Sequence, residues 1–316
     1  MQRKKWWIYP RIDPEIDEKL KAFPPYMRQL LFNRGCLDET SAVEYLNAST
    51  ILADPFLLLD MEKTVTRLLQ AAANREPIIV YGDYDVDGVS ATALMVQVLQ
   101  AFNADVSAYI PNRFDEGYGL NAEAVQDLFA RGAKVILTVD CGIRSQKEAL
   151  LAGELGMDMI ISDHHFPKGE LPQAYAVICP KRDGDPYPYK EMAGVGLAFK
   201  IAQGLFANQP VTGSLAEDWL DLVALGTVAD VVPLTGENRV LVRRGLNLLR
   251  QGKRIGLQAL IRISGRDPAR ISAGDIGFML GPRLNAAGRI DSAMQAYELL
   301  MSESVRSEER RVGKEC

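Results

Sequence analysis

The segment PIIVYGDYDVDG, residues 77–88, joins a short apolar run to three alternating aspartates between two glycines. Residues 77–81 have the length and composition of a buried strand, whereas residues 90–102 carry apolar side chains at helical spacing. A strand, a tight loop and an amphipathic helix in this order are typical of an α/β protein. We therefore take this segment as the start of an α/β core.

The same alternation continues along the chain. Further strands are expected at 106–110, 135–139, 159–161 and 176–178, with helices at 121–130 and 145–155 between them. Continuous apolar strands separated by amphipathic helices predict a mainly parallel, doubly wound sheet that is covered on both faces.

Four segments are expected. Residues 1–60 have apolar side chains at helical spacing interrupted by Pro24-Pro25, and we expect a helical N-terminal extension that covers one side of the core. The core is expected at 61–237, followed at 238–303 by a helical part that carries GPRLNAAGR. Across both segments, residues 190–305 are expected to be mostly helical, with helices near 196–207, 216–227, 239–249 and 293–301. The tail, 304–316, loses the apolar periodicity and supports no inference.

Bulk composition limits the class of protein. With 316 residues, 47% hydrophobic and 24% charged, the chain can bury a full core. The net charge of −5 argues against general adhesion to polyanions, although a carboxylate cluster presents a positive site once it is loaded with cations. Four widely spaced cysteines without a CxxC pair, no signal peptide and no run of 18 apolar residues predict a cytoplasmic protein with reduced thiols.

Ligand-type side chains stand where the expected strands end. Asp83 follows the first strand, Asp140 the third, and His164 lies just beyond the fourth. In open α/β sheets, ligands bind at the carboxyl ends of the strands, so these residues should converge on one edge.

Three further aspartates extend this set. Asp85 and Asp87 alternate with Asp83 in a loop that we expect to be extended, so that all three carboxylates face one way. Asp230, in VADVVP, is expected at another strand end. Carboxylates this close repel unless cations or protons compensate, and imidazole with carboxylate suits manganese, zinc or magnesium. A solvated or calcium-like loop is the alternative, but the EF-hand spacing is not present.

The only two histidines of the chain, His164 and His165, are adjacent in SDHH. Neighbouring side chains at an irregular strand end project in different directions, so one imidazole can ligate a metal while the other reaches a substrate oxygen. Asp163 can orient an imidazole from behind. No P-loop, dinucleotide-binding glycine motif or serine-nucleophile elbow occurs.

Phosphate-binding candidates lie in two segments rich in glycine and arginine. Arg113 belongs to PNRFDEGYG, and Arg283, Asn285 and Arg289 belong to GPRLNAAGR. Guanidinium groups bind phosphate oxygens bidentately. The stretch 239–270, with nine Arg or Lys and one acid, is either a solvated helix face or part of a groove for phosphates.

Several motifs over residues 60–300 together resemble the DHH phosphoesterase superfamily, and within it the RecJ single-strand-specific DNA exonucleases of bacteria. They occur in the family order: GDYDVDG, PNRFDEGYGL, VDCG, SDHH, LGTVADVVPL and GPRLNAAGR.

The resemblance implies that two divalent cations, Mn²⁺ or Mg²⁺, are bound by six residues, with Asp140 as a bridge. The six are Asp83, Asp85, Asp87, Asp140, His164 and Asp230. It also implies that His165 contacts the scissile phosphate, helped by Arg113, Arg283, Asn285 and Arg289. The implied reaction is 5′→3′ hydrolysis of single-stranded DNA to 5′ mononucleotides, and two cations about 3.5–4 Å apart can drive it without a side-chain nucleophile.

RecJ-type enzymes carry a second domain of the DHHA1 type and commonly an OB-fold, both of which are expected to be absent from this chain. Single-stranded DNA is the expected partner, together with a single-strand-binding protein and a recombination helicase, and a monomer with no membrane contact is expected. Two alternatives stay open: a phosphoesterase for short oligonucleotides, cyclic dinucleotides or pyrophosphate, and a non-catalytic scaffold of the replication machinery.

Overall fold

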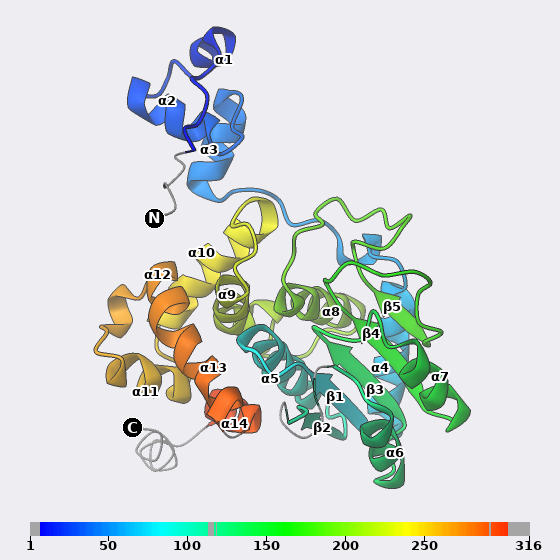
Figure 1. Cartoon of the computed structure of the whole chain (residues 1–316). Coiled ribbons are helices and arrows are strands. Elements are labelled where there is room, and N and C mark those ends of the chain that lie inside the picture. The colour runs from blue at the N-terminus through cyan, green and yellow to red at the C-terminus, as the bar shows by residue number, and fades with distance from the viewer. Residues whose placement is uncertain (1–6, 113–116, 118, 291, 303–316) are drawn as a thin grey trace, which may run out of the picture.

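The computed structural model describes residues 7–112, 117, 119–290 and 292–302, and its centre is a five-stranded parallel sheet (Figure 1). The strand order is β2-β1-β3-β4-β5. The strands are β1 (Ile78–Gly82), β2 (Val106–Tyr109), β3 (Val135–Val139), β4 (Asp158–Ser162) and β5 (Ala176–Ile178). All four pairings are parallel, which confirms the predicted sheet.

Helices cover both faces of this sheet. On one face, the side chains of α4 (Met61–Asn74), α5 (Val86–Ala101) and α8 (Gly194–Asn208) share a core with β1, β3 and β4. On the other face, α6 (Ala122–Ala130) and α7 (Gln146–Glu154) form a second, smaller core with the same strands. The doubly wound α/β class expected from the sequence is therefore confirmed.

Helix α5 is buried on every side except in its last turn, where Gln100 is exposed. It packs on β1 and is enclosed by α8, α9 (Leu220–Ala229) and α14 (Ala293–Met301). The remaining helical elements complete this half: η1 (Pro55–Leu57), η2 (Ala216–Trp219), α10 (Gly236–Arg250), α11 (Ile255–Ile263), η3 (Pro268–Arg270), α12 (Ala273–Asp275), the π-helical turn η4 (Ile276–Leu280) and α13 (Gly281–Ile290). The expected boundary at residue 237 falls within α10, which packs along α9.

Two expectations about the aspartates are wrong. The loop after β1 is not extended, because α5 begins at Val86 and places Asp87 in its first turn. Asp85 is the N-cap, whose carboxylate accepts hydrogen bonds from the N–H groups of Asp87 and Gly88. Asp230 does not follow a strand but is the C-cap of α9. Helices α4, α11 and α13 were not expected from the sequence.

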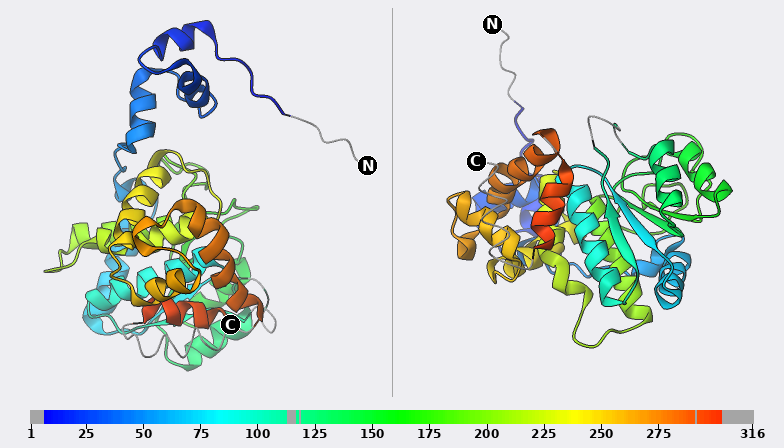
Figure 2. Two further views of the ribbon diagram at one scale, coloured as in Figure 1. Left: turned by 90° about the vertical axis from the view of Figure 1, so that its left-hand side faces the viewer. Right: turned by 90° about the horizontal axis from the view of Figure 1, so that it is seen from below.

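The N-terminal extension projects from the core and does not cover one side of it, as Figure 2 shows. Its helices α1 (Pro14–Lys19), α2 (Pro25–Phe32) and α3 (Glu39–Asn47) enclose a small core of their own. Two arginines of α10 attach it, because Arg239 and Arg243 donate to the carbonyl oxygens of Tyr45 and Leu46.

A buried ion pair holds the segment that leaves this extension. The Nζ of Lys200 lies 2.8 Å from Oε2 of Glu237, and both side chains are almost fully buried. Lys200 also donates to the carbonyl oxygen of Ala53, and Glu237 accepts from the N–H of Ala53 and the hydroxyl of Tyr187. Charges buried this deeply need such partners to balance desolvation.

The basic stretch 239–270 is largely engaged within the molecule. Besides the two arginines that hold the extension, Arg250 donates to the carbonyl of Ile271, and Arg254 pairs with Asp221 at 2.8 Å. The groove for phosphates is therefore not supported for these four arginines. Within the described part of the chain, no helix is long and apolar enough to cross a membrane.

The contact between α9 and α10 gives a test of the packing. A Cβ at Gly245 would lie 2.0 Å from the carbonyl oxygen of Leu220, whereas a Cβ at Gly153 in α7 would meet nothing within 4 Å. We expect Gly245→Ala to lower the free energy of unfolding by about 1–3 kcal/mol. The control Gly153→Ala should keep it or raise it by up to about 1 kcal/mol. Urea unfolding measures both, and an equal effect of the two substitutions would contradict the tight contact.

Candidate metal centre

The register of the sheet brings the strand ends into line. Gly82 pairs with Val139, Val139 with Ser162, and Ser162 with Ile178. The residues directly after β1, β3 and β4 are Asp83, Asp140 and Asp163, so these carboxylates lie along one edge of the sheet. The predicted convergence is thus a direct consequence of parallel pairing.

The backbone at this edge is strained. Asp140 has a φ of 64° and Val231, directly after Asp230, has a φ of 63°. This region costs energy for non-glycine residues, most of all for a β-branched one, and such positions are concentrated at functional sites. Neither position has a signal in the sequence.

The ligand-type atoms form overlapping groups in which all atoms lie within 4.8 Å of one another. The groups are Asp83–Asp85–Asp140, Asp87–His164–Asp230 and Asp140–His164–His165. Because Asp140 belongs to two groups, it lies between them. The structure thus brings together all six ligand candidates, which lie just after β1, β3 and β4, at the start of α5 and at the end of α9.

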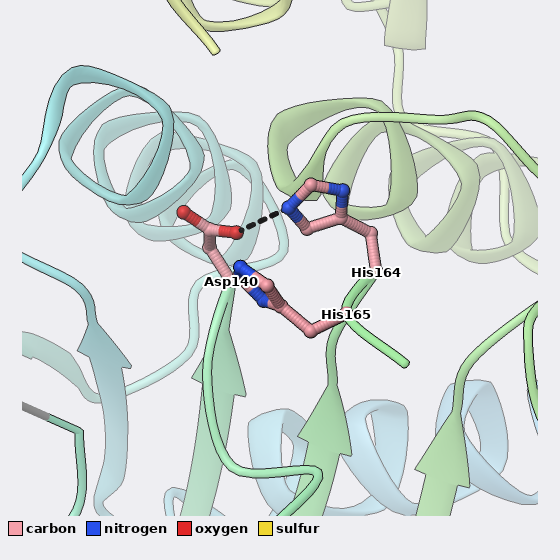
Figure 3. A group of neighbouring side chains, drawn as sticks. All are labelled: Asp140, His164 and His165. Atoms are coloured by element: carbon pink, nitrogen blue, oxygen red, sulfur yellow. Dashed lines mark ion pairs between the residues drawn. The ribbon is translucent and has the colours of Figure 1, made fainter. Parts of the chain in front are cut away.

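Figure 3 shows Asp140 and His164 pointing toward each other. The Nε2 of His164 lies 3.2 Å from Oδ1 of Asp140 and 3.7 Å from Oδ2 of Asp230. Nevertheless, neither nitrogen of His164 has a hydrogen-bond partner among the described residues, and the same holds for Oδ1 of Asp83, Oδ1 of Asp140 and Oδ2 of Asp230. Buried polar atoms are rarely left unpaired, so the chemistry of this donor set fits divalent cations.

Asp87 also joins the centre to the helical half. Its two carboxylate oxygens accept hydrogen bonds from the N–H groups of Gly194 and Val195, at 2.6 and 2.9 Å, at the start of α8. A Cβ at Gly194 would lie 2.5 Å from the Cβ of Asp140, and a Cβ at Gly226 would lie 2.7 Å from Oδ1 of Asp87. Sequence analysis missed both glycines, although GVG at 194–196 was the visible signal for the first.

His165 has a different environment from that of His164. Its Nδ1 lies 2.7 Å from Oδ1 of Asp163, which also accepts the N–H of His165. The other oxygen, Oδ2, accepts from the N–H of Ile143, so Asp163 is itself held in place. The side chain of His165 is 39% exposed, against 7% for His164. This bond leaves Nε2 of His165 free for another molecule.

Burial and mutual repulsion shift the titration of the centre. Burial, reinforced by the charge of Asp85, raises the pKa of Asp83 and Asp87 to about 7. The pKa of Asp140 is raised well above its ordinary value by the same causes, whereas burial lowers the pKa of His164. Without cations, the centre therefore favours protonated carboxyls.

The phosphate-binding candidates are placed differently. Asn285 and Arg289 line a depression of about 290 Å³ together with Ala229, the neighbour of Asp230. Oδ1 of Asn285 also accepts the N–H of Val86 at the start of α5. Arg283 is outside that lining and donates to the carbonyl of Met279. Arg113 lies outside the described residues.

Two basic residues near the histidines, Arg144 and Lys181, were not identified from the sequence. A hydrogen bond to Asp163 raises the pKa of His165, and the charge of Arg144 opposes this rise. Burial lowers the pKa of His164, and the charge of Lys181 adds to this lowering. Arg144 and Lys181 lie in segments without a recognisable motif.

Comparison with known proteins places this geometry in a family. The model of the DHH family, N-terminal domain, matches residues 77–227, which contain the sheet and most of the centre. Residues 77–227 belong to the DHH family. The single-stranded-DNA-specific exonuclease RecJ of Bacillus subtilis is 46% identical over 304 residues, which are 95% of this chain and 38% of that protein.

Solved structures agree with this DHH membership. A crystal structure of exonuclease RecJ bound to manganese aligns with a TM-score of 0.74 and 34% identity over 82% of this chain and 65% of that one. RecJ from Thermus thermophilus in complex with Mn²⁺ aligns with a TM-score of 0.79 and 30% identity over 95% of this chain and 42% of that one. The chain thus spans less than two thirds of each of these relatives.

The raised pKa of Asp83 gives a pH dependence for the DHH centre freed of cations by a chelator. Since the pKa is 3.8 in the unfolded reference and about 7 in the fold, the folded state binds more protons between these values. The free energy of unfolding therefore falls as pH rises from about 4 to 7, by at most about 1.4 kcal/mol per pH unit for this carboxyl.

Asp83→Asn should remove this contribution and flatten the profile, as measured by urea unfolding in chelator across that range. Added Mn²⁺ should restore stability to the wild-type protein at pH 7. Superimposable profiles for the two proteins in chelator would contradict the assignment.

Proposed function

We propose that this chain binds two divalent cations, Mn²⁺ or Mg²⁺, and serves to hydrolyse phosphodiester bonds of single-stranded DNA from the 5′ end, releasing 5′ mononucleotides. The observation that carries the proposal is the set of unpaired, buried ligand atoms around Asp140, next to the partly exposed His165. The similarity to RecJ exonucleases supports the substrate and the reaction.

The six ligands divide into two sets. Asp83 and Asp85 would hold one cation and Asp87, His164 and Asp230 the other. Asp140 would be shared, because it groups with Asp83 and Asp85 on one side and with His164 on the other. When bound, two such cations lower the pKa of a water molecule and neutralise the charge that develops on the phosphate. The described residues that form the centre are carboxylates and imidazoles, and this set is consistent with attack by water.

His165 would act on the phosphate and not on the cations. The Asp163 carboxylate fixes the ring through Nδ1 and favours its positively charged form, because this hydrogen bond raises the pKa of His165. Nε2 would then donate to a non-bridging oxygen of the scissile phosphate. A positively charged donor fixed in advance stabilises the negative charge of the transition state more than a mobile one.

The wider substrate contacts remain proposals. Arg289 and Asn285 would bind a neighbouring phosphate from their depression beside Asp230. Arg283 and Arg113 are further candidates from the sequence. A single-strand-binding protein and a recombination helicase are still predicted partners, and a monomer is still the predicted state.

The first test separates the two histidines. His164→Ala should lose Mn²⁺ affinity by at least about tenfold, because it removes a ligand from the buried group. His165→Ala should keep Mn²⁺ binding, measured by calorimetry on this chain, and lose turnover by about 10²–10⁴-fold in the full-length natural protein. Equal Mn²⁺ affinity in both variants would remove His164 from the ligand set.

The second test addresses the substrate. The full-length natural protein loaded with Mn²⁺ should release mononucleotides from a long single strand labelled at its 5′ end, and Asp140→Ala should abolish this release. The same protein should cleave a dinucleotide or a cyclic dinucleotide far more slowly. Faster cleavage of the dinucleotides would instead favour a phosphoesterase for short substrates. No Mn²⁺ binding by the wild-type protein would favour the scaffold alternative.

A further inference from the structure

The aromatic residue directly after His165 is exposed. Phe166 leaves 65% of its surface open to solvent, although it lies beside a centre whose other residues are mostly buried. An exposed phenylalanine has no benefit for folding, and a single one on a surface needs no explanation. What distinguishes Phe166 is the structure that holds it.

The backbone around Phe166 is fixed on both sides. The Arg144 guanidinium donates from Nε and Nη2 to the carbonyl oxygen of Phe166, at 3.3 and 3.1 Å. The carbonyl of the preceding residue, His165, accepts from the thiol of Cys179, and its N–H donates to Asp163. The ring of Phe166 is therefore presented from a rigid position.

A cation lies against this ring. The Nζ of Lys181 is 4.9 Å from the ring centroid of Phe166, and the Lys181 side chain is only 10% exposed. Lys181 also pairs weakly with Glu191, at 3.7 Å. Because the charge of Lys181 is felt by His164, the Phe166 ring, the cation and the metal centre share one region.

An exposed aromatic ring among cations has the chemistry of a platform for a nucleobase. Proteins that bind single strands combine positive charges that follow the phosphates with aromatic rings on which bases stack, whatever the base. Other exposed apolar residues, such as Phe278 and Ile290, have no cation in contact with them among the described interactions. Among the exposed aromatic residues that the structure describes, Phe166 is the one that adjoins His165.

We propose that Phe166 is a substrate-binding residue on which a base of the nucleotide next to the scissile phosphate stacks, with Lys181 behind the ring and Arg144 fixing its backbone. The inference rests on the proposed function, since it assigns the part of that substrate which lies beside His165. It adds a contact with the base, whereas the residues assigned above contact cations and phosphate alone. Stacking accepts every base, so the contact gives affinity for single strands without sequence preference.

The experiment compares three variants of the full-length natural protein with the wild type. Phe166→Ala removes the ring, Phe166→Tyr keeps it, and Phe129→Ala is the matched control, because Phe129 is 42% exposed near the end of α6, at the opposite edge of the sheet. Substrates are single strands that carry one abasic nucleotide at successive positions from the 5′ end. Rates are measured with Mn²⁺, and binding is measured without turnover in a His165→Ala background.

We expect one position at which loss of the base weakens binding to the wild type about 5- to 150-fold. At this position Phe166→Ala should bind the intact and the abasic strand equally, and it should bind the intact strand about as weakly as the wild type binds the abasic one. Phe166→Tyr and Phe129→Ala should behave as the wild type, with unchanged Mn²⁺ affinity in all variants.

Two results would overturn the assignment. An undiminished penalty for the abasic strand in Phe166→Ala would show that the base stacks elsewhere. An equal loss on intact and on wholly abasic strands would show that the ring contacts protein and not a base. Failure of the wild-type protein to bind or cleave any single strand is a separate outcome, because it would remove the proposed function itself.

Discussion

From Val86 to Val96 every residue of helix α5 is buried, and this constraint organises the rest of the molecule. The sheet covers one side of it, and α8, α9 and α14 must cover the others. A helix that is apolar all round is stable only when it is enclosed in this way. Because α8 begins and α9 ends beside the start of α5, their termini reach the edge of the sheet. Helix packing therefore places Asp87 and Asp230 close together, and both carboxylates belong to the candidate metal centre.

The centre is held in an arrangement that costs stability. Asp83 and Asp140 are buried with unpaired oxygens, and Asp140 has a left-handed backbone. Glycine at position 194 allows the start of α8 to approach Asp140 closely. A protein that needed only to fold would replace such carboxylates with apolar side chains. A bound cation would compensate the charge of these carboxylates and so offset the cost of burying them.

The sequence was sufficient for the strands and for the residues that follow them, although it left the amphipathic helices α4 and α11 unrecognised. Apolar runs placed the five strands, and parallel pairing then implied that Asp83, Asp140 and His164 share an edge. Contacts between distant segments were not accessible in the same way. Arg239 and Arg243 of α10 were interpreted only as part of a basic stretch. The backbone carbonyls of α3 that accept their hydrogen bonds leave no pattern in the sequence. Helix α13 was missed because GPRLNAAGR has little apolar periodicity and its packing is decided by α5 and α14.

The buried pair of Lys200 and Glu237 has a mechanical consequence. It holds Ala53 by both its N–H and its carbonyl, so the chain leaves the core in one fixed direction. The three N-terminal helices are then a rigid arm and not a body on a loose tether. Anything that the arm binds is kept at a set distance from the cations, and its effective concentration there depends on geometry instead of on the entropy of a linker.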